Sequence, residues 1–138
     1  SASFNEAERK MLAAIQNCLQ GQEDARLEEL KDMEPESQRK ICDAVLVHFK
    51  SDTINLSMIS RVYKEYPDYQ SDIIDALKAK PSSFFGPASI PHITRMYSAN
   101  ATQISNFLDD LEKSQKISQT IKSQITGGNF AVKAVDRR

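Results

Sequence analysis

The sequence predicts an all-α fold. Apolar residues recur at spacings of three and four along most of the 138-residue chain, a pattern typical of helices that bury one face. No run of β-branched residues alternates with polar ones between hairpin turns, so no strand is predicted. A third observation is a segment that recurs along the chain at a nearly constant interval.

The recurrence is clearest between two short segments. Residues 59–63 (Ile-Ser-Arg-Val-Tyr) match residues 93–97 (Ile-Thr-Arg-Met-Tyr) at an offset of 34. The same offset carries residues 73–77 onto 107–111, and a fainter copy at 35–45 matches 67–77. A period of this size, built from helix pairs, is typical of stacked α-helical arrays.

The predicted elements follow from caps and prolines. A capping box of Ser3 and Glu6 predicts a helix over residues 4–20 that ends before Gly21 and caps the open end of the stack. Three helix pairs follow over residues 23–49, 56–78 and 91–125, and Pro35, Pro67 and Pro91 stand where a first helical residue should.

The last helix is expected to run unbroken from Asn100 to about Ile125, before Gly127. Residues 1–127 are therefore predicted to form a single all-α helical-repeat domain. Residues 128–138 are predicted to be a flexible basic tail or a linker to a missing region, since the absence of an initiator Met suggests a fragment of a longer protein.

This arrangement resembles the HEAT and armadillo class of α-helical repeats over roughly Ala25 to Leu111. The resemblance implies a right-handed α-α superhelix whose curved surface binds proteins or, less often, RNA, and it transfers no functional residue. The tetratricopeptide pattern is absent, because the chain has no Trp and no Gly between Gly21 and Gly86. The alternative is a compact, irregular bundle of about seven helices.

Charge and cysteine usage limit the function classes. Residues 1–36 hold nine acidic and four basic side chains, whereas residues 37–138 hold ten acidic and fourteen basic ones. This asymmetry falls short of the basic stripe that phosphate binding needs. No apolar run approaches the roughly 18 residues of a membrane span. Cys18 and Cys42 are too few for a disulfide framework, so reduced thiols and a cytoplasmic or nuclear location are expected.

No constellation of residues predicts catalysis. His48 and His92 have no Cys or carboxylate at metal-ligand spacing, and there is neither a nucleophile elbow nor a Gly-rich phosphate loop. The sequence therefore predicts no enzyme, no cofactor and no metal. The recurring Asp43, Asp75 and Asp109 are interpreted as solvated carboxylates, or as partners of a loop amide, Arg61 or Arg95. The Asn100-Ala101-Thr102 sequon is interpreted as a helix cap.

The candidate binding residues are aromatic and basic. The aromatic candidates are Phe84, Phe85, Tyr66 and Tyr69. Phe84 and Phe85 lie in a Pro/Gly loop, where they are either exposed anchors for a partner or folded back over a helix-pair junction. The basic candidates of the C-terminal region are Lys113, Lys116, Lys122, Lys133, Arg137 and Arg138.

The leading functional hypothesis is a non-enzymatic protein–protein interaction module, part of an intracellular scaffold or adaptor. It would bind a partner peptide or helix, or pair with a second copy as a homodimer. The alternative is an RNA-binding or RNA-processing accessory domain that uses the basic C-terminal half.

Overall fold

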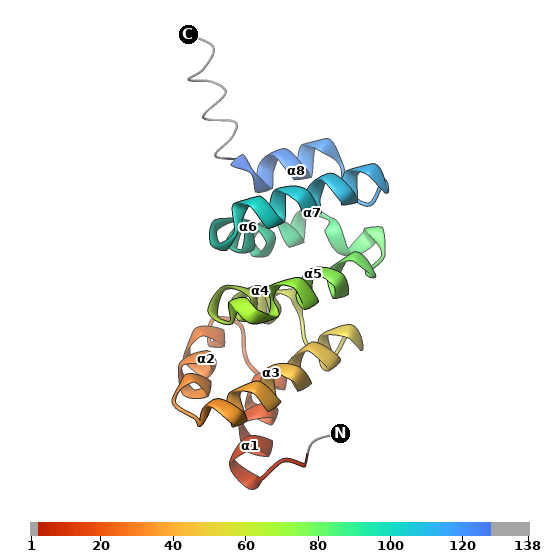
Figure 1. The fold of residues 1–138 in the computed structure, drawn as a ribbon. Coiled ribbons are helices and arrows are strands. Elements are labelled where there is room, and N and C mark those ends of the chain that lie inside the picture. The colour runs from red at the N-terminus through yellow and green to blue at the C-terminus, as the bar shows by residue number, and fades with distance from the viewer. Residues whose placement is uncertain (1–2, 128–138) are drawn as a thin grey trace. The chain divides into compact units, whose positions relative to one another are not determined.

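The computed structural model describes residues 3–127 of the chain. In that range it contains eight α-helices, three short 3-10 helices and no β-strand (Figure 1). The all-α prediction is therefore confirmed. None of the helices within the described range is long and apolar enough to cross a membrane.

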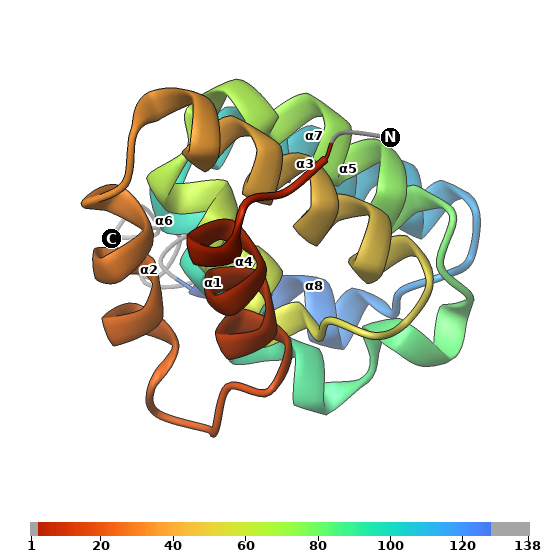
Figure 2. The same cartoon turned by 90° about the horizontal axis from the view of Figure 1, so that it is seen from below.

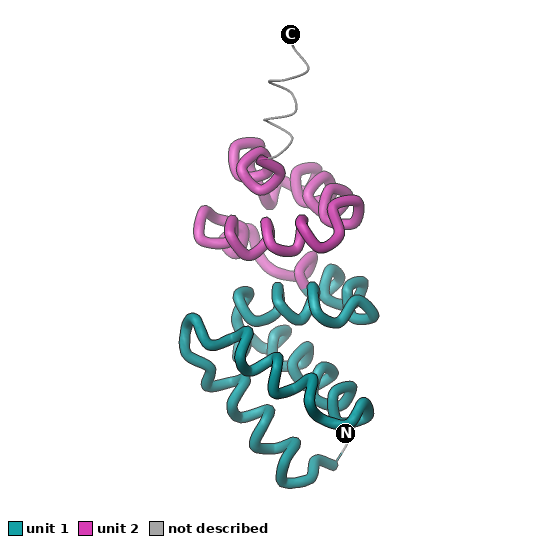
Figure 3. The backbone as a smooth tube through the Cα atoms, turned by 90° about the vertical axis from the view of Figure 1, so that its left-hand side faces the viewer, with its two compact units in different colours: residues 1–76 teal, residues 77–138 magenta. Residues whose placement is uncertain are grey.

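The chain divides into two compact units, residues 1–76 and residues 77–138 (Figure 3). The boundary falls within helix α5 (Gln70–Lys78). The single domain expected over residues 1–127 stays a prediction, and the predicted basic tail at 128–138 lies outside the described residues.

Unit 1 contains four complete helices, a 3-10 turn and most of α5. These elements are α1 (Glu6–Gln16), α2 (Glu23–Lys31), α3 (Pro35–Lys50), α4 (Leu56–Glu65) and η1 (Pro67–Tyr69). Helix α1 contacts α2 and α3, and α2 contacts α3 and α4, so each of these two helices touches the next helix and the one after it (Figure 2). Contacts of this order are those of a layered array of helix pairs.

In its described part, residues 77–127, unit 2 begins with the end of α5 and then contains two 3-10 turns and three helices. In chain order these are η2 (Ser82–Phe85), η3 (Pro87–Ser89), α6 (Ile90–Ala99), α7 (Ala101–Lys113) and α8 (Gln119–Ile125). Helix α6 contacts both α7 and α8, and α7 contacts α8. Here too, the first complete helix contacts both the next helix and the one after it.

The first two helix pairs lie close to their predicted boundaries. The pair expected over residues 23–49 corresponds to α2 and α3, and Pro35 is the first residue of α3. The pair expected over 56–78 corresponds to α4 and α5, and Pro67 opens the turn η1 that leads into α5. Proline suits both places because the amide it lacks would have no partner in a first helical turn.

Equivalent positions of the recurring segment have similar burial. Ile59 and Ile93 are both buried, as are Val62 and Met96. On the second helices of the pairs, Ile73, Ile74 and Leu77 are buried and so are their counterparts Phe107, Leu108 and Leu111. The fold is thus compatible with a helical-repeat class.

The N-terminal helix is shorter than predicted and has a different cap. It spans Glu6–Gln16 instead of residues 4–20, and its capping box is formed by Asn5 and Glu8. The Glu8 amide donates to Asn5 Oδ1, and the Asn5 amide donates to Glu8 Oε1, both at 2.8 Å. The box predicted at Ser3 and Glu6 is wrong, because Asn caps as well as Ser and stands at the same spacing from a Glu.

The long last helix predicted from Asn100 to Ile125 is wrong as well. Helix α7 ends at Lys113, and α8 begins at Gln119. Gln115 takes a left-handed conformation with φ of 61°, the Lys116 amide donates to the Leu111 carbonyl, and the Gln115 amide donates to the Glu112 carbonyl. These bonds form a Schellman motif, which terminates a helix. Ser118 then caps α8 by accepting a bond from the Ile121 amide.

Candidate functional site

A buried carboxylate joins α1 to α3. Glu8 is only 2% exposed; its Oε2 accepts a 2.5 Å hydrogen bond from Ser37 Oγ, and its Oε1 lies 2.8 Å from Lys40 Nζ. The hydrogen bonds from Lys40, from Ser37 and from the Asn5 amide lower the pKa of Glu8 to about 2. We refer to Glu8, Ser37 and Lys40 as the α1–α3 clasp, in which an ionised carboxylate holds two helices together.

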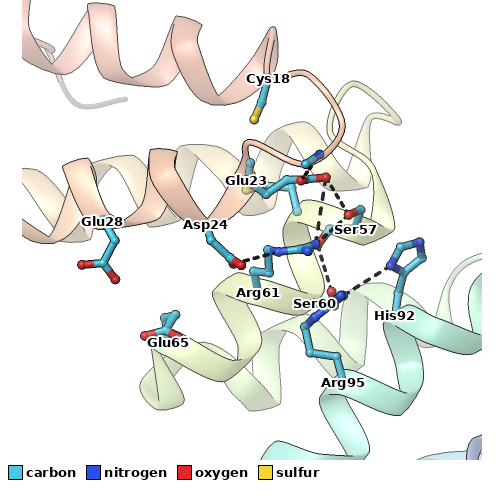
Figure 4. A network of polar contacts seen from close by, with 12 residues as sticks. Cys18, Glu23, Asp24, Glu28, Ser57, Ser60, Arg61, Glu65, His92 and Arg95 are labelled. Carbon is cyan, nitrogen blue, oxygen red and sulfur yellow. Dashed lines mark hydrogen bonds and ion pairs between the residues drawn. The ribbon is translucent and has the colours of Figure 1, made fainter.

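A second buried carboxylate joins α2 to α4 in the same way (Figure 4). Glu23 Oε2 accepts a 2.8 Å bond from Ser57 Oγ and lies 4.0 Å from Arg61 Nη1. Glu23 Oε1 accepts a 2.9 Å bond from the amide of Gly21, whose φ of 92° favours glycine. Arg61 Nε donates to Asp24 at 2.9 Å. We refer to Glu23, Ser57, Arg61 and Asp24 as the α2–α4 clasp.

The electrostatics of the second clasp also favour a charged carboxylate. Burial raises the pKa of Glu23, but the hydrogen bonds from Ser57 and from the backbone amides of Glu23 and Gly21 outweigh it, so the pKa is lowered overall. A carboxylate with a lowered pKa is a weak base near neutral pH. The Ser57 hydroxyl donates to this carboxylate and accepts a 2.8 Å bond from Arg61 Nη1.

The two clasps have a common plan. Each places a Glu at the beginning of one helix, a Ser in the first turn of the helix two further along, and a basic residue three or four positions after that Ser. Both lie inside unit 1. Sequence reasoning missed them, because the only signal is the spacing of Ser37 to Lys40 and of Ser57 to Arg61, and neither spacing identifies the glutamate that faces it.

A small pocket adjoins the α2–α4 clasp. It has a volume of about 150 Å³ and lies among the end of α1, the beginning of α2 and the segment joining α3 to α4. The residues that line it are Ile15, Gln16, Cys18, Glu23, Asp52, Thr53, Ile54, Asn55 and Met58. Leu19 follows the lining residue Cys18 in sequence and is 66% exposed. The apolar spacing places Leu19 on the stripe of the first predicted helix, whereas Leu19 lies beyond the end of α1 and is exposed; no pattern in the sequence predicts the pocket.

The Pro/Gly loop places its two phenylalanines differently. Phe85 is only 2% exposed, and its ring packs edge-on against Phe107 with a centroid distance of 6.1 Å. The exposed-anchor interpretation is therefore wrong for Phe85, which folds back into the core of unit 2. Phe84 is half-buried, contacts Phe85 edge-on at 5.5 Å, and has Lys80 Nζ 5.4 Å from its ring centroid.

The two candidate tyrosines bind α3 through their hydroxyls. Tyr66 donates to Gln38 Oε1 at 2.8 Å, and Tyr69 donates to Asp43 Oδ1 at 2.7 Å. Burial raises the pKa of Tyr66 to about 12; burial and the hydrogen bond to Asp43 raise the pKa of Tyr69 as well. Both hydroxyls thus act within unit 1, although each ring remains half-exposed.

Of the three basic candidates that the structure describes, two have intramolecular roles. Lys116 Nζ donates to the carbonyls of Lys78 and Lys80 at 2.7 and 2.9 Å. Lys122 Nζ lies 2.7 Å from both Asp109 and Glu112. Lys113 is exposed. The other three, Lys133, Arg137 and Arg138, lie outside the described residues.

The recurring aspartates have individual surroundings. Asp43 accepts the bond from Tyr69, Asp109 pairs with Lys122, and Asp75 is exposed. Asp43 and Asp109 thus interact with Tyr69 and Lys122, whereas the sequence suggested Arg61 or Arg95.

The remaining polar candidates have local roles. Asn100 caps α7 by accepting the Gln103 amide at 3.1 Å, which confirms the cap interpretation. Cys42 is buried and Cys18 half-buried, and burial raises the pKa of both thiols, that of Cys42 to about 12. Residues 3–127 contain no group of three or more His, Cys, Asp or Glu side chains placed to hold a metal ion.

Comparison with known proteins gives no relative: no family model, no curated protein and no solved structure matches the chain.

Proposed function

We propose that this chain is a non-enzymatic protein-interaction module, of the scaffold or adaptor kind, built on a HEAT- or armadillo-like helical array. The observation that carries the proposal is the exposed apolar side chain of Leu19, which directly follows Cys18, a residue that lines a small pocket with a partly apolar lining. An apolar side chain next to a concave site is the arrangement in which partner side chains bury most of their contact energy.

The buried and half-buried polar side chains of unit 1 bond to other parts of the chain, which supports a role other than catalysis. The two buried glutamates are ionised and engaged by Ser, Lys or Arg side chains, and the Tyr66 and Tyr69 hydroxyls bond to α3. The interaction surface we favour is therefore the α1–α2 side of unit 1, in place of the Phe84 loop.

A reducing compartment, the cytoplasm or the nucleus, suits the two free thiols. The RNA-binding alternative gains no support from Lys116 and Lys122, because both ammonium groups already bond within the chain. A protein partner therefore remains the better hypothesis.

A selection of displayed random peptides on the full chain tests the proposal. We expect the selection to enrich peptides that bind the chain saturably. Their binding should release heat and show a negative heat-capacity change, which is the mark of apolar burial. Enriched peptides should lose affinity when Leu19 is changed to Ser. A selection that yields no saturable binder would contradict the proposed function.

A further inference from the structure

A second pocket lies in unit 2 and is lined by the end of α5, the end of α7 and the turn after α7. It has a volume of about 290 Å³. Half of its lining residues are lysines; the lining consists of Lys78, Asp110, Leu111, Lys113, Ser114 and Lys116. We refer to it as the lysine pocket. All of these residues belong to unit 2, so the lysine pocket shares no residue with the α1–α2 side of unit 1.

The lysine pocket has an excess of positive charge. Three ammonium groups and one carboxylate line it, which gives a net charge of +2. Lys78 Nζ lies 3.2 Å from Asp110 Oδ2, but the two side chains are 45% and 53% exposed, so water weakens this ion pair. No carboxylate of the described residues pairs with Lys113 or Lys116.

The ammonium group of Lys116 is fixed in position and keeps its charge. It donates to the carbonyls of Lys78 and Lys80 at 2.7 and 2.9 Å. Both acceptors are neutral, and an ammonium group has three N–H donors, so one donor remains for a ligand. Because Lys116 is already ordered, a ligand would not have to bear the entropy cost of ordering this side chain.

The ends of the two helices are bonded without Lys113. Lysines in a last helical turn often interact with the unpaired carbonyls there. In α7, however, the carbonyls of residues 110–112 accept backbone amides from residues 114–116. At the end of α5, Lys116 takes up the carbonyls of residues 78 and 80. The exposed ammonium group of Lys113 is therefore open to a group from outside the chain.

The charge and the size of the lysine pocket select the kind of ligand. A phosphate monoester carries a charge of about −1.5 to −2 at pH 7 and has three strong acceptor oxygens. These oxygens match the N–H donors of Lys113 and Lys116 and the hydroxyl of Ser114. A carboxylate or a phosphodiester has only one negative charge. The volume lies just below the roughly 300–1,000 Å³ of sites for drug-sized ligands, so it suits a single phosphate group.

We infer that the lysine pocket binds a phosphate monoester, with Lys113 and Lys116 as its cationic contacts and Ser114 as a hydroxyl donor. The ligand is either a free small phosphate or a phosphorylated side chain of a protein. The inference adds a site in unit 2 and does not depend on the peptide surface proposed in unit 1.

NMR titration of the isotope-labelled full chain tests the site at constant ionic strength, since salt screens exposed charges. The probes are methyl phosphate and an end-blocked Ala-phosphoserine-Ala peptide; dimethyl phosphate and the unphosphorylated peptide are the controls. We expect methyl phosphate to shift the backbone amides of residues 78 and 111–116 saturably. Dimethyl phosphate should bind at least about fivefold more weakly, because it has one negative charge. The unphosphorylated peptide should give no shifts.

The phosphopeptide distinguishes the two sources of the ligand. Tighter binding of the phosphopeptide than of methyl phosphate would assign the site to a phosphorylated protein. Weaker binding would assign it to a free small phosphate.

Charge variants with a matched control complete the experiment. We expect Lys113→Gln to weaken binding of methyl phosphate by about fivefold. Lys64→Gln is the control and should leave binding unchanged, since Lys64 is also an exposed lysine in a last helical turn but does not line the pocket. Asp110→Asn should tighten binding by about threefold, because it removes the carboxylate that competes for Lys78.

Three results would each overturn the inference. The first is that methyl phosphate gives no saturable shifts at residues 78 and 111–116. The second is that dimethyl phosphate binds as tightly as methyl phosphate. The third is that the Lys113 and Lys64 variants bind methyl phosphate equally. All three substitutions are at exposed positions, and circular dichroism of each variant verifies that the helices are retained.

Discussion

At the scale of residues, the defining feature is the use of buried carboxylates as connectors. Glu8 and Glu23 each lie in the interior of unit 1 and are matched by a serine hydroxyl and a basic side chain. A buried charge is tolerated only with such partners, and removal of one partner leaves the other desolvated and unpaired. A packing that separates α1 from α3, or α2 from α4, would therefore leave a buried charge unpaired.

Replacement of Ser57 by Ala tests the second clasp. The change removes the hydroxyl that donates to Glu23 and accepts from Arg61, so we expect the free energy of unfolding to fall by about 1–2 kcal/mol. Urea denaturation followed by circular dichroism measures the loss. Ser71→Ala is the control on an exposed position of α5, where we expect no loss, since Ala favours helix.

The pH dependence of stability tests the first clasp. The pKa of Glu8 is about 2 in the folded chain and 4.5 as the ordinary value, so folding favours the ionised form. The stabilisation is fully present above pH 4.5 and is lost progressively as the pH falls toward 2. In the Glu8→Gln variant, the contribution of Glu8 to the slope of the free energy of unfolding against pH should vanish. An unchanged slope between pH 4.5 and 2 in that variant would show that Glu8 is not so engaged.

At the scale of elements, the spacing of apolar residues does not predict where a helix ends or how a loop packs. Helices α3 and α7 both end in a Schellman motif whose left-handed residue is not glycine, Asp52 in one case and Gln115 in the other. Because glycine is the usual signal for such an end, nothing in the apolar spacing marked the break between α7 and α8. Phe85 likewise lies in a Pro/Gly segment that is predicted to be a loop, but its side chain packs in the core of unit 2.

Gln115 offers a direct test of the helix break. A left-handed conformation is strained for a residue with a Cβ, so Gln115→Gly should raise the free energy of unfolding by about 0.5–1 kcal/mol, after the extra entropy of unfolded glycine is subtracted. Gln115→Val should lower it, because a β-branched residue fits that conformation poorly. If α7 and α8 were one continuous helix, glycine would instead be the destabilising change. Thermal denaturation distinguishes the two cases.

The two phenylalanines of η2 form a natural pair of variants. Phe85→Ala should lower the free energy of unfolding by about 3–5 kcal/mol, since it empties a site in the core of unit 2 beside Phe107. Phe84→Ala should cost distinctly less, because Phe84 is only half-buried. Equal losses in denaturant titrations would mean that the loop packs differently.

At the scale of the whole molecule, sequence reasoning succeeded where one helix's own pattern decides the outcome. The spacing of apolar residues and the positions of Pro35 and Pro67 predict the helices of both early pairs. The clasps and the pocket could not be predicted, because they arise from contacts between helices 29 to 34 residues apart in the chain, such as Ser37 with Glu8 and Ser57 with Glu23. Those contacts depend on how α1 to α4 pack, which periodicity alone leaves open.

The central claim is that the chain binds a protein partner at the α1–α2 side of unit 1. Isothermal titration of a selected peptide into three proteins tests it most directly: the unaltered chain, Leu19→Ser, and Val47→Ser as a control. Val47 is 59% exposed, comparable with the 66% of Leu19, but it lies on α3 and does not line the pocket. We predict that Leu19→Ser raises the Kd by about tenfold or more, equivalent to about 1.4 kcal/mol, and that Val47→Ser leaves it unchanged. Equal affinities of all three proteins for the peptide would contradict the claim.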